Sequence, residues 1–210
     1  MSQTPGLRER KKQRTRELIA ETARRLFLER GFDRVTVAQV AREAEVAEQT
    51  VFNYFPSKEE LFYFRMESFE DQLLEAIRER DAGETILAAF RRFVLAPRGA
   101  LAARDAEKLE AITRAITESP ALLAHERRVT ERYTRSLGEL IAAETGARAG
   151  NVEPWVVANA LMGVHRALID YVRERTLAGA APKDVARGVR AQGERALARL
   201  EAGLGGYAPR

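Results

Sequence analysis

Two very short helix patterns, separated by a three-residue turn, constrain this chain more than any other feature. They lie within residues 36–60, TVAQVAREAEVAEQTVFNYFPSKEE. The first begins at Thr36, with Gln39 at the capping-box position, and its apolar residues recur at helical spacing. The second runs from about Ala47 to Tyr54. A module this short cannot bury a core alone, so it needs a supporting helix and leaves a polar outer face for another purpose.

The neighbouring segments supply that support and the next helix. Residues 9–30 have the apolar spacing of an amphipathic helix, and Gly31 is its C-terminal stop. Ser57 and Glu60 form a second capping-box pattern, which predicts a further helix over 58–80. We therefore expect a supporting helix and two short helices, followed directly by another long helix.

The rest of the chain predicts an all-α fold. Pro and Gly separate helical patterns, and no alternating strand pattern occurs. The expected helices cover 85–96, 102–117, 120–145, 154–178 and 183–203. The expected domains are residues 1–58, with a helix-turn-helix, and residues 59–210, which are helical.

The stretch from about Arg14 to Leu61 resembles the DNA-binding domain of tetracycline-repressor-like (TetR family) transcription regulators. The resemblance rests on RGF at 30–32, TVAQVA at 36–41, TVFNYF at 50–55 and PSKEEL at 56–61. Two positions depart from the family pattern. The usual glycine of the turn is Glu45, where a left-handed conformation costs about 1 kcal/mol. The usual serine at the start of the recognition helix is Ala47, which removes a helix cap.

The resemblance implies a homodimeric repressor that binds a palindromic double-stranded DNA operator and leaves it when a small effector binds the C-terminal domain. Phosphate contacts are expected from Thr36, Thr50, Tyr54 and Lys58, and base contacts from Glu48, Gln49, Phe52 and Asn53. Amide side chains can bond adenine, a carboxylate can accept from cytosine, and an aromatic ring can touch a thymine methyl group. The alternative for Phe52 and Tyr54 is a place in the core of so small a domain.

The formal charge is concentrated in the N-terminal part. Residues 1–58 contain 12 Lys and Arg against 8 Asp and Glu, whereas residues 59–210 contain 23 of each. Residues 1–16 hold one acidic residue, Glu9, and six basic ones, which are Arg8, Arg10, Lys11, Lys12, Arg14 and Arg16. Such a basic arm suits contact with DNA phosphates, and the alternative is a solvated tail.

The segment 154–178 carries two apolar stripes. One contains Trp155, Ala158, Met162, His165, Ile169 and Val172, and the other contains Val157, Leu161, Val164, Leu168 and Tyr171. A surface helix needs only one such face, so we expect a second subunit to help cover this helix. The last helix has small residues at Gly188, Gly193 and Ala196, which suits close packing. We therefore expect dimerisation through the last two helices, with a monomer as the alternative.

An effector pocket is expected inside the C-terminal domain, and its apolar character favours a hydrophobic or aromatic effector. The candidate residues are Phe93, Ile112, Ile116, Tyr133, Leu137, Trp155, Asn159, Met162 and His165. At helical spacing each of them could equally belong to the core. Regulation by a protein partner, without a small effector, is the second interpretation.

Composition argues against an enzyme, a metal site or a bound cofactor. The chain has no Cys and only two His, and it lacks a glycine-rich phosphate loop. A helical enzyme remains the third interpretation, although no convergent titratable cluster is visible. The first residues are too polar for a secretory signal and no apolar run is as long as a membrane span, so we expect a cytoplasmic protein without membrane contact.

Overall fold

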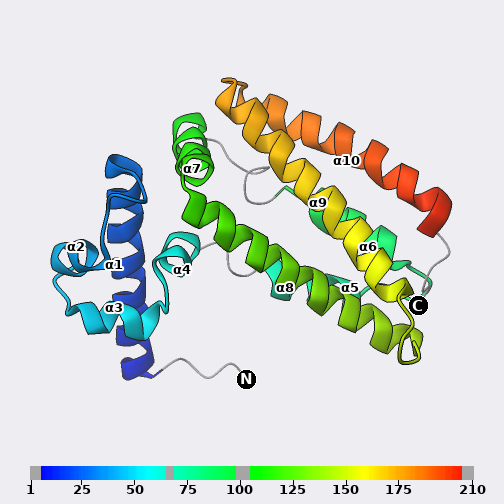
Figure 1. The fold of residues 1–210 in the computed structure, drawn as a ribbon, viewed down its shortest axis with the longest axis horizontal. Helices are drawn as coiled ribbons and strands as arrows, with labels where there is room; N and C mark the ends of the chain where they lie inside the picture. Colours follow the sequence, from blue (N-terminus) through cyan, green and yellow to red (C-terminus); the bar gives the residue numbers. More distant parts are fainter. Residues whose placement is uncertain (1–5, 65–68, 98–104, 205–210) are drawn as a thin grey trace. The chain divides into compact units, whose positions relative to one another are not determined.

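The computed structural model describes residues 6–64, 69–97 and 105–204. Within these ranges the chain forms α-helices and no β-strand, which confirms the all-α prediction (Figure 1). The helices are α1 (Leu7–Arg30), α2 (Val37–Glu43), α3 (Glu48–Tyr54), α4 (Lys58–Tyr63), α5 (Phe69–Arg78), α6 (Ile86–Val94), α7 (Ala106–Glu118), α8 (Pro120–Thr145), α9 (Glu153–Leu177) and α10 (Pro182–Leu204).

The predicted helix boundaries agree closely with these bounds in most places. The helix predicted over 58–80 corresponds to α4 and α5, and residues 65–68 between them lie outside the described ranges. The helix predicted over 102–117 corresponds to α7, and residues 102–104 likewise lie outside.

The chain forms two compact units. Unit 1 contains the described residues of 1–67 together with 115–125. Unit 2 contains the described residues of 68–114 together with 126–210. Helices α7 and α8 therefore each contribute residues to both units.

Unit 1 is built around an aromatic cluster. Helix α1 packs against α2 and α4, and α2 packs against α3. Phe27, Phe32 and Phe62 are buried, with ring centroids 5.0 to 6.0 Å apart. The Ser119 hydroxyl, at the start of α8, donates to the Asp33 carboxylate at 2.8 Å, so residues 115–125 are held by a polar contact as well as by packing.

The turn between α2 and α3 adopts the strained geometry that the sequence predicts. Glu45 has φ of 55°, and it is the one non-glycine residue with a positive φ among the described residues. The Val46 N–H donates to the Ala41 carbonyl at 2.9 Å, which closes the turn after α2. Ala47 precedes α3 without a side-chain cap, as expected.

Unit 2 has its core between α5, α6, α8, α9 and α10. Phe90, Leu137 and Leu161 come from three of these helices and are fully buried in one hydrophobic cluster. Helix α9 packs against α10 and α6, and α10 also packs against α6.

Both apolar stripes of α9 are covered in part within unit 2, and the dimer expected through the last two helices stays a prediction. Ala158 and Met162 of the first stripe are buried, as are Val157 and Leu161 of the second. Helices α6 and α10 both pack against α9, so the chain itself supplies this part of the cover.

The small residues of α10 allow close packing inside the unit. A Cβ atom on Gly188 would collide with the Tyr171 hydroxyl of α9. A Cβ atom on Gly193 would lie 2.5 Å from a Leu95 methyl carbon and 3.3 Å from one of Leu168. The close packing expected of these glycines is therefore present, but between helices of the same chain.

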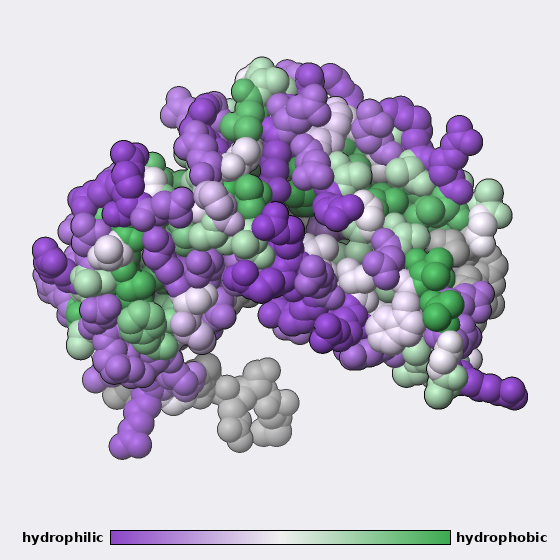
Figure 2. Space-filling model, viewed as in Figure 1, coloured by the Kyte–Doolittle hydropathy of each residue, from purple (hydrophilic) through white to green (hydrophobic). Residues whose placement is uncertain are grey.

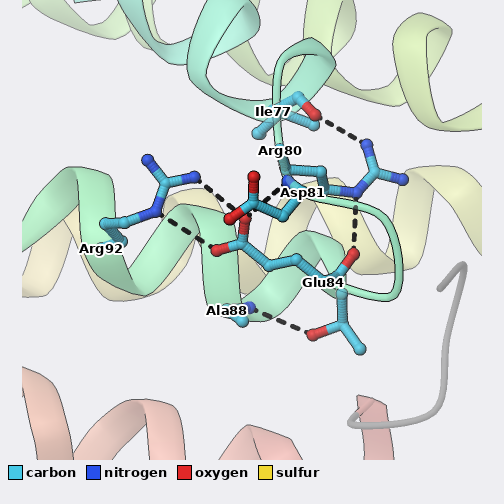
Figure 3. A network of polar contacts seen from close by, with 7 residues as sticks. Ile77, Arg80, Asp81, Glu84, Ala88 and Arg92 are labelled. Carbon is cyan, nitrogen blue, oxygen red and sulfur yellow. Dashed lines mark hydrogen bonds and ion pairs between the residues drawn. The ribbon is translucent and has the colours of Figure 1, made fainter. Parts of the chain in front are cut away.

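A polar network fixes the connection between α5 and α6 (Figure 3). The buried Arg80 guanidinium donates to the Ile77 carbonyl at 2.7 Å and to the Glu84 carbonyl at 3.1 Å. A third nitrogen of Arg80 pairs with the Glu144 carboxylate at 2.7 Å. The Glu84 carboxylate pairs with two nitrogens of Arg92, and this hydrogen bonding lowers the pKa of Glu84.

Candidate nucleic-acid interface and ligand groove

Four side chains of α3 form an exposed face. Glu48, Gln49, Phe52 and Asn53 are exposed, and their spacing of one, four and five residues puts them on the same side of the helix. Phe52 exposes 42% of its surface, although it is a large hydrophobic residue. Val51 points to the core instead and is buried. The face therefore combines hydrogen-bonding groups with one aromatic ring, and both kinds of group can contact base edges in a DNA groove.

Two of these side chains hold each other in place. The Gln49 amide nitrogen donates to the Asn53 amide oxygen at 3.2 Å. This bond leaves the Gln49 oxygen and the Asn53 nitrogen with hydrogen-bonding capacity. The pair consequently presents an acceptor and a donor with a restricted orientation.

The residues expected to contact DNA phosphates differ in their exposure to solvent. Thr36 is exposed, and its hydroxyl oxygen accepts from the Gln39 N–H at 3.2 Å, which completes the capping box before α2. Its hydroxyl hydrogen can still donate to a phosphate. Thr50 and Tyr54 are half-buried on α3, between the exposed face and the core.

Lys58 lies against the aromatic cluster of unit 1. Its ammonium group is 4.2 Å from the ring centroid of Phe32 and 5.9 Å from that of Phe27. Burial lowers the pKa of Lys58, while the negative charges of Asp33 and Glu59 act in the opposite direction. The side chain thus has a cation–π role that sequence spacing could not reveal.

The basic N-terminal segment is helical from Leu7 onward, and residues 1–5 lie outside the described ranges. Its basic residues from Arg8 to Arg14 are exposed along the first turns of α1. Arg16 differs, because its guanidinium carbon lies 4.4 Å from the Phe64 ring centroid and 5.5 Å from that of Phe55.

Most of the effector candidates pack in the interior. Phe93, Tyr133 and Leu137 belong to the hydrophobic cluster of unit 2. Ile112 is half-buried in unit 2, whereas Ile116 is buried in unit 1.

His165 also faces apolar neighbours. Its imidazole stacks on the Phe69 ring, with centroids 4.4 Å apart and an interplanar angle of 23°. Burial lowers the pKa of His165 to about 4, so the ring is neutral at pH 7.

The remaining candidates line an open groove between α8 and α9, which run in opposite directions (Figure 1). The groove has a volume of about 340 Å³. Helix α9 contributes Trp155, Asn159, Met162, Gly163 and Arg166, and α8 contributes Thr130, Glu131, Thr134 and Arg135. Hydrophilic residues gather over the middle of α8 on this face, beside more hydrophobic ones toward the start of α9 (Figure 2).

The Trp155 ring forms one end of the groove. It packs on Gly138 of α8 so closely that a Cβ atom there would collide with it. The Asn159 amide nitrogen donates to the Trp155 carbonyl at 2.7 Å, so the amide oxygen of Asn159 remains as an acceptor.

The sequence predicted three lining residues of α9, Trp155, Asn159 and Met162, but not Gly163, Arg166 or the lining residues of α8. Thr130 and Thr134, like Glu131 and Arg135, are separated by four residues and therefore recur on one side of α8. That spacing is a usable signal, but it equally fits a solvated helix face. Only the packing of Trp155 against α8 shows that the two surfaces form one groove.

Within the described residues, no group of three or more His, Asp or Glu side chains could hold a metal ion. None of the helices described is long and apolar enough to span a lipid bilayer.

Two family models match the chain. Residues 19–63 match the model of bacterial regulatory proteins of the tetR family, and residues 84–204 match the MftR C-terminal domain. Together they cover helices of both units.

Characterised relatives agree with these matches. The chain is 37% identical over 147 residues to the HTH-type transcriptional regulator TcmR of Streptomyces glaucescens, a match that covers 68% of this chain and 65% of TcmR. It is 34% identical over 84 residues to the nucleoid occlusion factor SlmA of Haemophilus influenzae, which covers 40% of this chain and 38% of SlmA. The chain thus spans less than two thirds of the length of either relative.

Solved structures show the same fold. Native NalD, the secondary repressor of the MexAB-OprM multidrug efflux pump in Pseudomonas aeruginosa, superposes with a TM-score of 0.58 at 22% identity, covering 89% of this chain and 96% of NalD. The family models, the relatives and the fold agree with the exposed face of α3, and the chain therefore belongs to the TetR family of DNA-binding transcription regulators.

Proposed function

We propose that the protein is a homodimeric repressor that reads its operator with the exposed face of α3. The observation that carries this proposal is the pairing of Gln49 with Asn53 beside the exposed ring of Phe52. Restricted amides lose less conformational freedom on binding than mobile ones, so such a pair suits base recognition. Glu48 lies on the same face and can accept from a cytosine amino group.

Charge supports the same orientation toward DNA. The excess of basic residues lies within residues 1–58, and the basic side chains from Arg8 to Arg14 are exposed. Contacts with phosphates from α1, Thr36, Thr50, Tyr54 and Lys58 would position α3 without reading sequence. Lys58 would have to leave the ring of Phe32 or bind a phosphate from its place above it.

We further propose that two copies pair through α9 and α10, and that a small aromatic effector in the C-terminal part releases the DNA. Val152 and Val156, at the start of α9, are exposed to 68% and 58%, and their burial in a dimer would be favourable. A dimer can bridge half-sites one helical turn apart, roughly 34 to 36 Å, so a small change in the spacing of the two α3 helices would weaken binding.

The proposal is tested on DNA sequences that the protein selects from a random library. We expect Gln49→Ala to lose discrimination at one base pair, worth roughly 1 to 3 kcal/mol, in a panel of single-base variants. We expect Lys58→Met, which keeps the apolar stem, to weaken binding about equally across the panel. Gln72→Ala, at an exposed amide on α5 and so outside α3, α9 and α10, is the matched control and should change neither property. A uniform loss in Gln49→Ala would remove Gln49 from base reading.

A further inference from the structure

The groove between α8 and α9 contains two arginines that other side chains do not neutralise. Arg135 and Arg166 both line it, and neither forms an ion pair within the described ranges. Two other arginines of these helices are ion-paired: Arg132 pairs with Glu70 at 3.0 Å, and Arg173 pairs with Glu126 at 2.5 Å. The groove thus holds two guanidinium groups whose charge is available to a bound anion.

The groove is also suited to a flat apolar group. The Trp155 ring forms one end of it, and the Met162 side chain of the same helix, which is almost fully buried, also lines it. Gly163 adds no side chain, so the floor stays open at that point. A ring placed against Trp155 would gain stacking and burial of apolar surface.

The apolar and cationic parts lie within the reach of one small molecule. Gly138, against which the Trp155 ring packs, is three residues from Arg135 along α8, a rise of about 4.5 Å. Arg166 is three turns from Trp155 along α9, about 16 Å away in rise, and also lines the groove with its long side chain. An aromatic ring near Trp155 would therefore hold an acidic substituent beside Arg135, facing Arg166.

We propose that this groove binds a small aromatic carboxylate, with the ring against Trp155 and the carboxylate between Arg135 and Arg166. The volume of about 340 Å³ is at the lower end of the range for ligand sites, which fits a compact molecule. Guanidinium groups recognise carboxylates by paired hydrogen bonds, and the Asn159 amide oxygen and the hydroxyl of Thr130 can bond further polar groups. The carboxylate of Glu131 opposes an anion, so the lining carries a net charge of one positive unit.

Binding in the groove does not depend on the role proposed above, and only its effect on DNA rests on the proposed function. If the aromatic carboxylate is the effector, its acidic group refines the expectation of an apolar effector. The repressor would then respond to organic acids rather than to neutral hydrocarbons.

Trp155 makes the test direct, because it is the only tryptophan in the chain. The probes are 3-phenylpropanoate and its neutral amide, 3-phenylpropanamide, which have the same ring and differ in charge. They are titrated up to millimolar concentrations into the full-length protein, and binding is followed by tryptophan emission and by calorimetry. We expect the carboxylate to change the emission and to bind several-fold more tightly than the amide.

Charge variants assign the interaction to particular residues. Arg135→Gln and Arg166→Gln should each weaken binding of the carboxylate roughly 3- to 10-fold and leave binding of the amide unchanged. Glu131→Gln should have the opposite effect, because it removes a negative charge from the groove, and should tighten binding of the carboxylate. Arg128→Gln is the matched control, since Arg128 is an exposed arginine of α8 outside the groove, and it should change neither affinity.

Besides a failure to bind the carboxylate, two kinds of result would overturn the proposal. The first is equal binding of the two probes, or an affinity for the carboxylate that Arg135→Gln and Arg166→Gln leave intact. The second is a Trp155 emission that changes on dilution of the protein and not with either probe, because the groove would then be covered by a second copy. A displacement assay on operator DNA separates the ligand site from the effector role. If the carboxylate binds the protein but does not displace it from DNA, the effector role is refuted and the ligand site is not. If the carboxylate does not bind, the ligand site is refuted and DNA recognition by α3 is not.

Discussion

Acidification should destabilise the fold through His165. The imidazole stacks on Phe69 in an apolar environment that lowers its pKa from 6.5 to about 4. Between these values the unfolded chain binds a proton at this residue and the folded protein does not, so the free energy of unfolding falls as the pH falls from 6.5 to 4. At 1.36 kcal/mol for each pH unit, the whole interval corresponds to roughly 3 kcal/mol, an upper limit that partial relaxation around the ring would reduce.

The assay compares variants, because carboxylates titrate in the same interval. Chemical unfolding of the wild type and of His165→Leu is measured at several pH values from 7 to 4.5, and the difference between their unfolding free energies is plotted against pH. We expect this difference to change by about 2 to 3 kcal/mol in favour of the variant as the pH falls. The chain has one other histidine, His125, and His125→Leu is the control for a histidine that stacks on Tyr63 in unit 1.

A direct titration supplies the decisive measurement. With two histidines in the chain, the proton resonances of the two imidazole rings are readily assigned by substitution. A pKa of His165 near 6.5 in the folded protein, or a stability difference that is flat with pH, would show that the ring is hydrated and that the reasoning from burial is wrong.

Two further substitutions test local geometry. Glu45→Gly removes a strained non-glycine residue with φ of 55° and one negative charge near the proposed interface. We expect about 1 kcal/mol of added stability in thermal unfolding and tighter non-specific DNA binding. A less stable variant would reveal a partner for the carboxylate. Gly138→Ala places a methyl group against the Trp155 ring, so we expect a shifted tryptophan emission and a loss of about 1 to 3 kcal/mol, whereas an unchanged emission would mean that the ring does not lie on α8.

Local sequence signals predicted the elements of this fold well, because each depends on neighbours along the chain. Capping boxes located the starts of α2 and α4, and prolines located the starts of α8 and α10. The strained turn was also predictable, because a helix-turn-helix needs a positive φ at the position that Glu45 occupies.

Predictions that depend on distant neighbours succeeded less often. The two apolar stripes of α9 were correctly located, but periodicity does not reveal whether a face is covered by α10 or by another chain. The position of Lys58 over Phe32 and the meeting of Arg135 with Trp155 in one groove likewise join residues from separate helices. Such pairs follow from packing and leave no mark in the spacing of either helix.

The network at Arg80 has a consequence for substitution and for local opening. One guanidinium serves the carbonyls of Ile77 and Glu84 and the carboxylate of Glu144, using separate nitrogens that point in fixed directions. A lysine, with a single nitrogen, cannot reach three acceptors arranged in this way, so the exchange would leave buried carbonyl oxygens without donors. Because all three partners must be released together, the corner between α5 and α6 should open cooperatively and rarely, and its amide hydrogens should exchange with solvent more slowly than their position at a helix end suggests.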